Sequence, residues 1–321
     1  MTFEKPLVSI MIPTYNQPEF LPEAVESALK QTYPNLEIII ADDNSTSNEV
    51  QEILDRYQDN PKVRVCRNEV NRGRVGNYQH TLYTEAHGEW VVNLDGDDYF
   101  YDSTFIDNAM ELANKYSELV LISGRYIDLS PAGELKVCLA NRGVAKVCRP
   151  EEAYSGILTG DFFPFHGSTL YKRAKAIEIG FYEKDIISSD MESLLRIMQT
   201  GIIGIIPSEA MVRRRHGGNV SCSLTVDTFI ADIASFIAPL RMDKKIKTIV
   251  PRDWMKSWVK KYTFHKGKDN AYKILKNLHS NADYFKYLKS IREYFPCVAF
   301  LIFVQPKNIL RVFKNLLFKA S

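Results

Sequence analysis

The stretch GEWVVNLDGDDYF (Gly88–Phe100) ends an apolar run with Asp95, Asp97 and Asp98 within four positions. Two carboxylates about 5 Å apart repel each other by about 3 kcal/mol at an effective dielectric of about 20. A solvated acidic turn tolerates this repulsion, and a cation or substrate bound among the carboxylates relieves it. The stretch alone leaves both interpretations open, so the rest of the chain must decide between them.

The first hundred residues alternate between short apolar runs and stripes at helical spacing. The apolar runs, rich in Ile and Val, are Leu7–Ile12, Leu36–Ala41, Val63–Cys66 and Trp90–Leu94. Such continuous runs are typical of strands buried on both faces of a parallel sheet. A helical stripe precedes each later run, and Pro18 suits the first turn of the first helix. This alternation predicts an α/β fold, with a mixed, mostly parallel sheet flanked by helices on both faces.

Three polar clusters follow strands of this predicted sheet. They are PTYN (Pro13–Asn16), DDNS (Asp42–Ser45) and DGDD (Asp95–Asp98). Ligands of open α/β sheets bind outside the carboxyl ends of the strands, so the three clusters predict a site. Mg²⁺ and Mn²⁺ prefer oxygen ligands such as these carboxylates. The sequence lacks the calcium-loop spacing of an EF-hand, a Walker A loop and a G-x-G-x-x-G fingerprint.

Composition indicates two modules. The 321 residues are 45% hydrophobic, enough for one large core or two smaller ones. The net charge is +2, but residues 241–321 contain 19 Lys and Arg against 5 Asp and Glu. We therefore expect a catalytic domain over residues 1–225 and a basic, mainly helical module over 226–321. Scattered cysteines without a C-x-x-C pair, and an N-terminus that reads as a strand, favour a cytoplasmic protein.

The basic module carries apolar patterning as well. The run CVAFLIFV (Cys297–Val304) is shorter than the about 20 residues that a membrane span needs. The segment Pro306–Ser321 places Ile and Leu on one helical face and basic residues on the other. This pattern favours a helix on an anionic membrane surface; the alternative is a helix packed on its own domain with a solvated basic face. No nucleic-acid-binding motif accompanies the charge, so we expect no nucleic-acid partner.

The order of the motifs resembles the family 2 glycosyltransferases, which have a GT-A fold. The segments that carry this resemblance are VSIMIPTYNQ, EIIIADDNS, NRGRVGN, GEWVVNLDGDD, SSDMESLLR and RRRHGGNVS, and they cover roughly residues 5–225. The resemblance implies a nucleotide-sugar donor, Mn²⁺ or Mg²⁺ as cofactor, and transfer to an acceptor hydroxyl with inversion at the anomeric carbon.

The resemblance also implies a nucleobase pocket. Pro13, Tyr15 and Asp43 would line it, with Asp42 beside them. A carboxylate that accepts an N–H from a pyrimidine ring favours uracil, although thymine presents the same edge, so a UDP-sugar is the expected donor. For Asp42 the alternative is a helix N-cap or turn residue.

The same resemblance implies a metal and diphosphate site. Asp95 would lie near the ribose and the metal, and Asp97 would be the main metal ligand. In RRRHGGNVS, which matches an R-x-H-x-x-N-x-S pattern, His216 would complete the metal or diphosphate site, although a lone histidine is more often structural. Arg214 and Arg215 would offset charge on the leaving nucleoside diphosphate, and the sequence does not tell which of them points inward.

An inverting transfer needs a carboxylate that removes the proton of the acceptor hydroxyl. Asp190 matches the base of the family, and Arg196 matches its usual arginine. The acidic residue that commonly precedes the base is replaced by Ser189, which leaves Glu192 as a competitor. A carboxylate at a helix N-terminus is alternatively a residue that stabilises the helix dipole.

Two further departures concern the donor site. In NRGRVGN the arginine often found before the second Asn is replaced by Gly76, and Arg74 is the candidate to supply a cation instead. In FFPFHGSTLYKR, His166 and Ser168 are candidates for sugar contacts, with a buried turn as the alternative.

Together these patterns predict a metal-dependent inverting glycosyltransferase that uses a nucleotide sugar. A lipid-linked acceptor is inferred from the charge and apolar patterning of the basic module alone. The expected acceptor is a glycan or lipid-linked glycan of surface polysaccharide synthesis, with the protein peripheral at the inner face of the plasma membrane. The alternatives are a noncatalytic nucleotide- or glycan-binding subunit and a nucleotidyltransferase. A nucleotidyltransferase would need a glycine-rich, phosphate-binding loop after the first strand. The sequence there is PTYN, which is not such a loop. The oligomeric state is not indicated.

Overall fold

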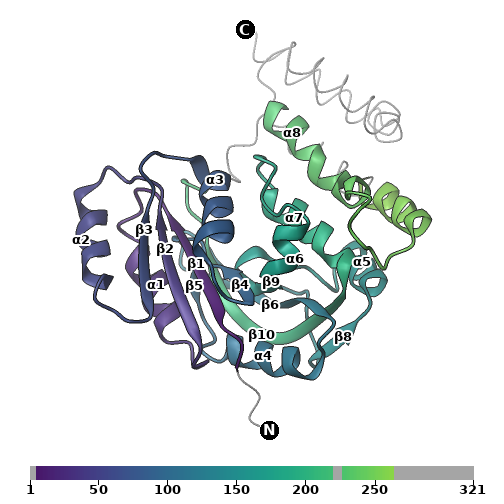
Figure 1. Cartoon of the computed structure of the whole chain (residues 1–321), viewed down its shortest axis with the longest axis horizontal. Helices are drawn as coiled ribbons and strands as arrows, with labels where there is room; N and C mark the ends of the chain where they lie inside the picture. Colours follow the sequence, from purple (N-terminus) through teal and green to yellow (C-terminus); the bar gives the residue numbers. More distant parts are fainter. Residues whose placement is uncertain (1–4, 220–225, 264–321) are drawn as a thin grey trace. The chain divides into compact units, whose positions relative to one another are not determined.

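The computed structural model describes residues 5–219 and 226–263. Its centre is a ten-stranded sheet with the strand order β3-β2-β1-β4-β9-β6-β10-β5, to which β7 and β8 add at β6 and β10 (Figure 1). The strands are β1 (Val8–Thr14), β2 (Leu36–Asp42), β3 (Val63–Arg67), β4 (Trp90–Asn93), β5 (Tyr99–Phe100), β6 (Leu119–Leu129), β7 (Leu135–Val137), β8 (Lys146–Cys148), β9 (Thr169–Lys172) and β10 (Ile202–Arg214).

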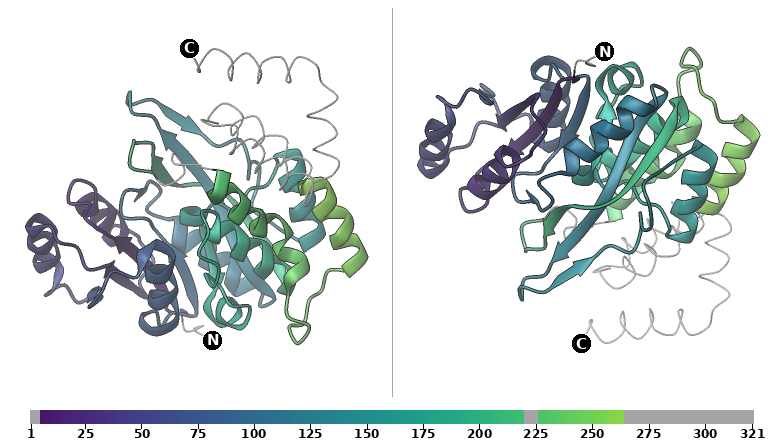
Figure 2. Two further views of the ribbon diagram at one scale, coloured as in Figure 1. Left: turned by 90° about the horizontal axis from the view of Figure 1, so that it is seen from above. Right: turned by 90° about the horizontal axis from the view of Figure 1, so that it is seen from below.

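Helices connect most of these strands. The α-helices are α1 (Leu21–Leu29), α2 (Asn48–Tyr57), α3 (Gly73–His80), α4 (Phe105–Lys115), α5 (Pro150–Thr159), α6 (Arg173–Glu178), α7 (Ser189–Ile197) and α8 (Val226–Ile237). A π-helical turn, η1 (Thr81–Glu85), continues α3, and residues 252–263 are also helical. Figure 2 shows helices on both sides of the sheet.

Strands β1 to β4 run parallel to one another. In their register Thr14 lies opposite Asp42, Asp42 lies opposite Arg67, and Met11 lies opposite Asn93. Their carboxyl ends therefore meet at one edge of the sheet, as the apolar runs predict. Strand β9 is antiparallel to β4 and β6, whereas β10 runs parallel to β6 along most of its length. The predicted mixed, mostly parallel sheet flanked by helices is confirmed.

The main core lies between the sheet and α1, α2 and α4. It contains the apolar stripes of these helices packed on Val8, Ile10 and Ile12 of β1. Helix α1 begins at Leu21, with Pro22 in its first turn, while Pro18 lies in the preceding turn. The expected place of Pro18 in the helix is thus wrong, because the backbone turns once more before the helix begins.

Strand β6 extends well beyond the apolar run from which it was predicted. Polar residues interrupt the sequence pattern after Ile122, yet each finds a partner on a neighbouring strand. Ser123 shares a hydrogen bond with Thr169 at 3.0 Å, and Arg125 forms an ion pair with Glu209 at 3.3 Å. The strand can continue because these pairs satisfy side chains that would otherwise end it.

The chain divides into two compact units. The first runs to Asp185 and also includes Ser189–Gly217 and Met242–Val250, and the second contains Ile186–Ser188, Gly218–Arg241 and the chain from Pro251. Within the described part of the second unit, the Trp258 and Tyr262 rings stack at 4.6 Å. No described helix is long and apolar enough to cross a membrane. The predicted amphipathic segment 306–321 and the run 297–304 lie outside the described residues.

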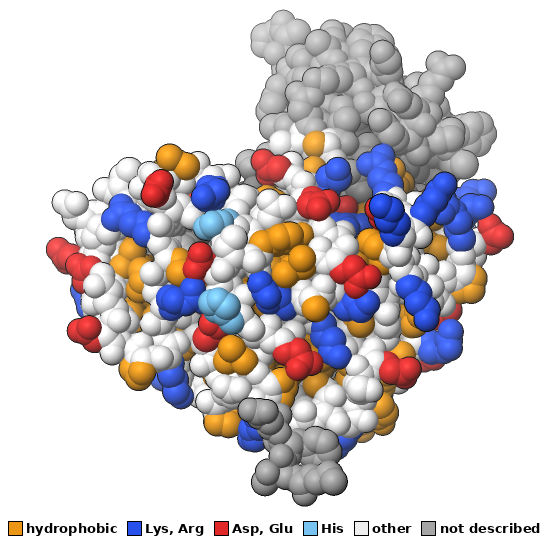
Figure 3. Space-filling view, in the orientation of Figure 1, with side chains coloured by type: hydrophobic (Ala, Val, Ile, Leu, Met, Phe, Trp, Pro, Cys, Tyr) orange, Lys and Arg blue, Asp and Glu red, His pale blue; other side chains and the backbone are white. Residues whose placement is uncertain are grey.

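The surface of the described residues has mixed charge on the face that Figure 3 shows. Acidic and basic side chains are interspersed there among apolar ones. Charge on this face is not gathered into a field of a single sign.

Candidate functional site

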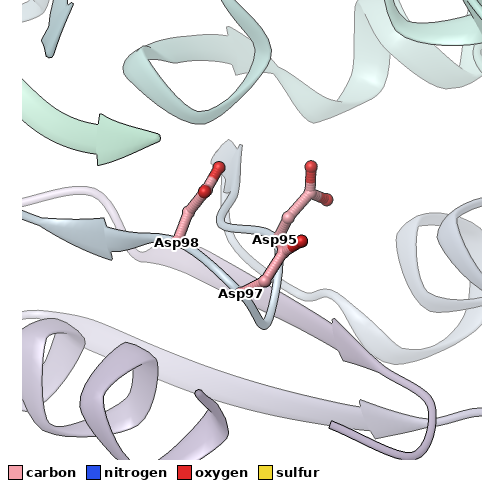
Figure 4. Close-up of side chains that lie close together, drawn as sticks. All are labelled: Asp95, Asp97 and Asp98. Atoms are coloured by element: carbon pink, nitrogen blue, oxygen red, sulfur yellow. The ribbon is translucent and has the colours of Figure 1, made fainter. Parts of the chain in front are cut away.

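The acidic turn that follows β4 brings three carboxylates together. Oxygen atoms of Asp95, Asp97 and Asp98 lie within 4.8 Å of one another, and the side chains project from one turn (Figure 4). Gly96 fits this turn because a Cβ atom there would lie 2.8 Å from the carbonyl oxygen of Pro13. The Gly96 N–H donates to that same oxygen at 3.1 Å, which fixes the turn against β1.

The electrostatics of this turn favour a cation. Burial and the charge of Asp95 raise the pKa of Asp97, although a hydrogen bond with His216 acts in the opposite direction. Burial and the charges of Asp97 and Asp95 raise the pKa of Asp98 well above its ordinary value. The three carboxylates are therefore unfavourable as neighbouring anions in this environment, and a bound cation would relieve their repulsion.

An imidazole completes the set of possible ligands. The Nε2 atom of His216 lies 2.9 Å from Oδ2 of Asp97, and the histidine stands two residues beyond the end of β10. The carboxylate oxygens suit both Mn²⁺ and Mg²⁺, and the imidazole nitrogen beside them favours a transition metal such as Mn²⁺ over Mg²⁺. Asp95, Asp97 and His216 would hold such an ion, which would supply positive charge to a diphosphate.

Arg214, at the end of β10, contacts the acidic turn directly. Its backbone N–H donates to Oδ1 of Asp98 at 2.8 Å, and its Nη1 donates to the carbonyl oxygen of Asp97 at 2.7 Å. The guanidinium also lies 4.6 Å from the centre of the Tyr99 ring and pairs with Glu23. Arg214 is therefore in place to meet an anion bound at the turn.

Arg215 points to a different carboxylate. Its Nη2 lies 3.0 Å from Oδ2 of Asp128, which also pairs with Arg213 at 2.6 Å. Because side chains alternate along a strand, consecutive arginines at the end of β10 face opposite ways. Of the two predicted arginines, the structure brings Arg214 to the acidic turn.

Asp42 makes hydrogen bonds within its own turn. Its side chain is fully buried, both carboxylate oxygens lie 3.2 Å from the N–H of Ser45, and Oδ2 lies 3.3 Å from Nε of Arg67. These contacts agree with the turn interpretation of this residue.

Asp43 is arranged differently. Its Oδ1 accepts hydrogen bonds from Nδ2 of Asn68 and from the N–H of Arg72, both at 2.8 Å. Its Oδ2 accepts none from the described residues. Pro13 is buried nearby in β1, and Tyr15 is 46% exposed just beyond the strand. The second oxygen of Asp43 is thus the one that can accept from a ligand.

Arg74 connects the acidic turn with the predicted base. Helix α3 places its guanidinium 5.5 Å from the centre of the Tyr78 ring. Burial alone would lower the pKa of Arg74, but the charges of Tyr78, Asp190 and Asp95 outweigh burial and raise it. Asp190 and Asp95 therefore act on the same cation from α7 and from the acidic turn.

The structure distinguishes the two carboxylates at the start of α7. Glu192 is 4% exposed, and its oxygens lie 3.0 and 2.9 Å from Nε and Nη2 of Arg196, which also donates to the carbonyl oxygen of Gly180. Glu192 thus belongs to a buried ion pair. Asp190 is half-buried, lies in the field of Arg74 and forms no ion pair with the described residues, so of the two carboxylates it is the one that can meet a ligand.

Sequence reasoning missed two residues that hold Asp95. The hydroxyl of Tyr78 donates to its Oδ1 at 2.6 Å, and Nδ2 of Asn93 donates to the same atom at 2.9 Å. Asn93 was detectable as a polar residue at the end of an apolar strand. Tyr78 gave no signal, because it fits the apolar stripe of α3.

Comparison with known proteins gives a family match and several relatives. A family model described as glycosyl transferase family 2 matches residues 9–180. The poly(ribitol-phosphate) beta-N-acetylglucosaminyltransferase TarS from Staphylococcus aureus is 30% identical over 168 residues, which are 49% of this chain and 29% of TarS. Chondroitin synthase from Pasteurella multocida is 28% identical over 67% of this chain and 21% of its own length. The chain thus matches less than a third of each of these relatives.

Solved structures confirm the fold. TarS residues 1–349 from S. aureus in complex with UDP-GlcNAc superpose with a TM-score of 0.70 at 15% identity, covering 90% of this chain and 80% of that one. The mannosyltransferase PcManGT from Pyrobaculum calidifontis in complex with GDP-Man and Mn²⁺ has a TM-score of 0.59 at 18% identity, covering 96% and 88%. At these identities the similarity concerns the fold, which is the predicted GT-A fold.

Proposed function

Because the chain belongs to glycosyl transferase family 2, we propose that it transfers a sugar from a nucleoside diphosphate donor to an acceptor hydroxyl, with inversion at the anomeric carbon. The observation that carries this proposal is the meeting of the acidic turn, His216 and Arg214 on one side with Arg74 and Asp190 on the other. These groups can bind a polyanion and accept a proton in the same place.

We propose UDP as the nucleotide of the donor. TarS is described in complex with UDP-GlcNAc and with UDP, and PcManGT with GDP-Man. In this chain the open Oδ2 of Asp43 can accept the ring N–H of uracil, while buried Pro13 and exposed Tyr15 supply apolar surface beside it. A guanine base also offers N–H donors, so the nucleotide must be measured.

The proposed chemistry follows from the positions of these side chains. Asp95, Asp97 and His216 would hold Mn²⁺ or Mg²⁺, which supplies charge stabilisation to the leaving diphosphate when bound. The Arg214 guanidinium, anchored on the Asp97 carbonyl, adds a second positive charge there. Asp190 would take the proton of the acceptor hydroxyl as its oxygen forms the bond to the anomeric carbon, and the bond to the diphosphate oxygen breaks.

For the acceptor we propose a hydroxyl of a glycan or glycopolymer. The named relatives include a poly(ribitol-phosphate) transferase and a chondroitin synthase, which act on polymers. A lipid-linked glycan, met at the inner face of the plasma membrane through the basic residues 241–321, is the form that the charge of that segment supports.

Donor hydrolysis across a panel of UDP-, GDP- and dTDP-sugars, with Mn²⁺ and with Mn²⁺ plus EDTA, tests the proposal. We expect hydrolysis of one UDP-sugar that stops with the chelator. Equal hydrolysis in both conditions would contradict the metal role of Asp97. No turnover of any donor, together with tight nucleotide binding, would favour a noncatalytic binding subunit.

A further inference from the structure

The carboxylate of Asp95 is held through one of its two oxygens. Tyr78 and Asn93 both donate to Oδ1, at 2.6 and 2.9 Å, while Oδ2 accepts no hydrogen bond from the described residues. Two donors on one oxygen fix the plane of the carboxylate and turn its second oxygen away from them. The orientation of Asp95 therefore depends on the groups that hold these two donors.

The amide of Asn93 is in turn held by His166. Asn93 is fully buried at the end of β4, and its Nδ2 lies 3.4 Å from Nδ1 of His166. Because Nδ2 donates to Asp95, the facing Nδ1 must be the acceptor, and His166 carries its proton on Nε2. That Nε2 donates to the hydroxyl of Tyr182.

Tyr182 is held in an unusual backbone conformation. Its φ is +61°, a left-handed value that a bulky residue adopts only at an energetic cost. Its N–H donates to Oγ of Ser193, on the helix α7 that begins with Ser189 and Asp190, at 3.0 Å. A buried polar chain of Asn93, His166 and Tyr182 thus joins α7 to Asp95.

We propose that this buried polar chain positions the Asp95 carboxylate for the divalent ion and relative to α7. His166 and Tyr182 are positioning residues in this assignment, because neither touches Asp95. The inference rests on the proposed function, since it assigns Asp95 to an ion bound with a nucleoside diphosphate.

Two features indicate that the buried polar chain has a role beyond packing in the core. The Oδ1 atom of Asn93 is buried and has no hydrogen-bond partner among the described residues, a desolvation cost that an apolar side chain would avoid. The left-handed backbone of Tyr182 adds conformational strain. Both costs are explained if the Asn93 NH₂ group and the Tyr182 hydroxyl are needed in these positions to orient the Asp95 carboxylate.

A pair of substitutions at His166 tests whether the buried polar chain positions Asp95. His166→Asn keeps a polar atom near the position of Nδ1, which can accept from Asn93, whereas His166→Gln keeps one near Nε2, which can reach Tyr182 only. The measurement is the dissociation constant of Mn²⁺ in the presence of UDP, by electron paramagnetic resonance on the full chain. We expect His166→Gln to weaken Mn²⁺ binding roughly tenfold, as outer partners of metal ligands do, and His166→Asn less than threefold.

Tyr182→Phe removes one hydroxyl and keeps the ring. The matched control is Tyr154→Phe. Tyr154 is buried to a similar extent, and its hydroxyl donates to the carbonyl oxygen of Leu195, which is not part of the buried polar chain of Asn93, His166 and Tyr182. We expect Tyr182→Phe to weaken Mn²⁺ binding roughly three- to tenfold and Tyr154→Phe to leave it unchanged.

The outcomes separate this inference from the proposed function. Equal Mn²⁺ affinity in wild type, His166→Gln and Tyr182→Phe would overturn the positioning role and leave the proposed function intact. Equal weakening in both His166 variants, accompanied by the same loss of thermal stability, would overturn it too, because general loss of packing would then suffice. A wild type that binds no Mn²⁺ with UDP would contradict the ion site itself.

Discussion

The Nε2 atom of His216 lies 2.9 Å from Oδ2 of Asp97, although 119 residues separate the two in sequence. The long strand β10 makes this contact. Its pairing with β5 sets Val212 opposite Tyr99, so the residues just beyond Val212 arrive beside the acidic turn. One strand thereby adds an imidazole and a guanidinium to a site that β4 begins.

Asp97→Asn should remove Mn²⁺ binding and at the same time stabilise the metal-free protein. Burial and the charge of Asp95 raise the pKa of Asp97, so its charge is unfavourable in the folded state. We expect a gain of about 1 kcal/mol in the free energy of unfolding without metal, measured by urea denaturation in EDTA. Asp128→Asn is the control and should destabilise, because Asp128 pairs with two arginines. Equal loss of stability in both variants would show that the charge of Asp97 does not destabilise the metal-free folded protein.

Asp190→Asn should lower kcat by about 10²–10⁴-fold, because the amide cannot accept the proton of the acceptor. Binding of the donor, measured by calorimetry, should stay within threefold of wild type. The matched variant is Glu192→Gln, which weakens a buried ion pair with Arg196 and should lower the free energy of unfolding by about 3 kcal/mol. If Glu192→Gln lost kcat at unchanged stability while Asp190→Asn kept its turnover, the roles would be exchanged.

Arg214→Ala should raise the KM for the donor roughly tenfold or more, since a charged hydrogen-bond donor beside the diphosphate contributes about 1.5–3 kcal/mol. Arg215→Ala should change it less than threefold, because its guanidinium lies on Asp128. Steady-state kinetics with the donor identified in the panel decide the matter. A larger effect from Arg215 than from Arg214 would contradict the assignment made from the structure.

Glu37 gives the protein a defined dependence on acid. Burial alone would raise its pKa, but hydrogen bonds from Ser9 and His87 and the pair with Arg64 outweigh burial and lower it. A group with a lowered folded pKa stabilises above its unfolded pKa, and this stabilisation is lost as the pH falls through the folded pKa.

Glu37→Gln should therefore destabilise the protein by about 1–2 kcal/mol at pH 7, and the difference from wild type should shrink below pH 4. Thermal denaturation across pH 3–8 measures it. Exposed Glu52→Gln, on the surface of α2, is the control and should show no difference at any pH. A constant difference between Glu37→Gln and wild type across this range would exclude the ionised carboxylate as its cause.

The parallel half of the fold could be predicted because its signals are local. Runs such as Leu36–Ala41 and stripes such as that of α1 report burial directly, and the parallel direction of these strands follows from their alternation with helices. The strands β9 and β10 gave weaker signals, because polar residues interrupt them and their partners are distant in sequence.

The candidate site shows the same division. The acidic turn and Asp190 were predicted from short motifs, whereas the choice between Arg214 and Arg215 depends on which way one strand faces. Glu192 could have been assigned from sequence, since Arg196 follows it at the helical spacing of four residues. The role of Tyr78 needed coordinates, because a hydroxyl within an apolar stripe has no sequence signature.

The contact between Gly96 and the carbonyl oxygen of Pro13 joins the acidic turn to the end of β1. In the proposed function, this backbone hydrogen bond sets the distance between the diphosphate site at the acidic turn and the base pocket beside Pro13. We therefore expect any change of donor preference in this protein to come from side-chain substitutions, because the backbone hydrogen bond keeps the spacing between the two proposed sites constant.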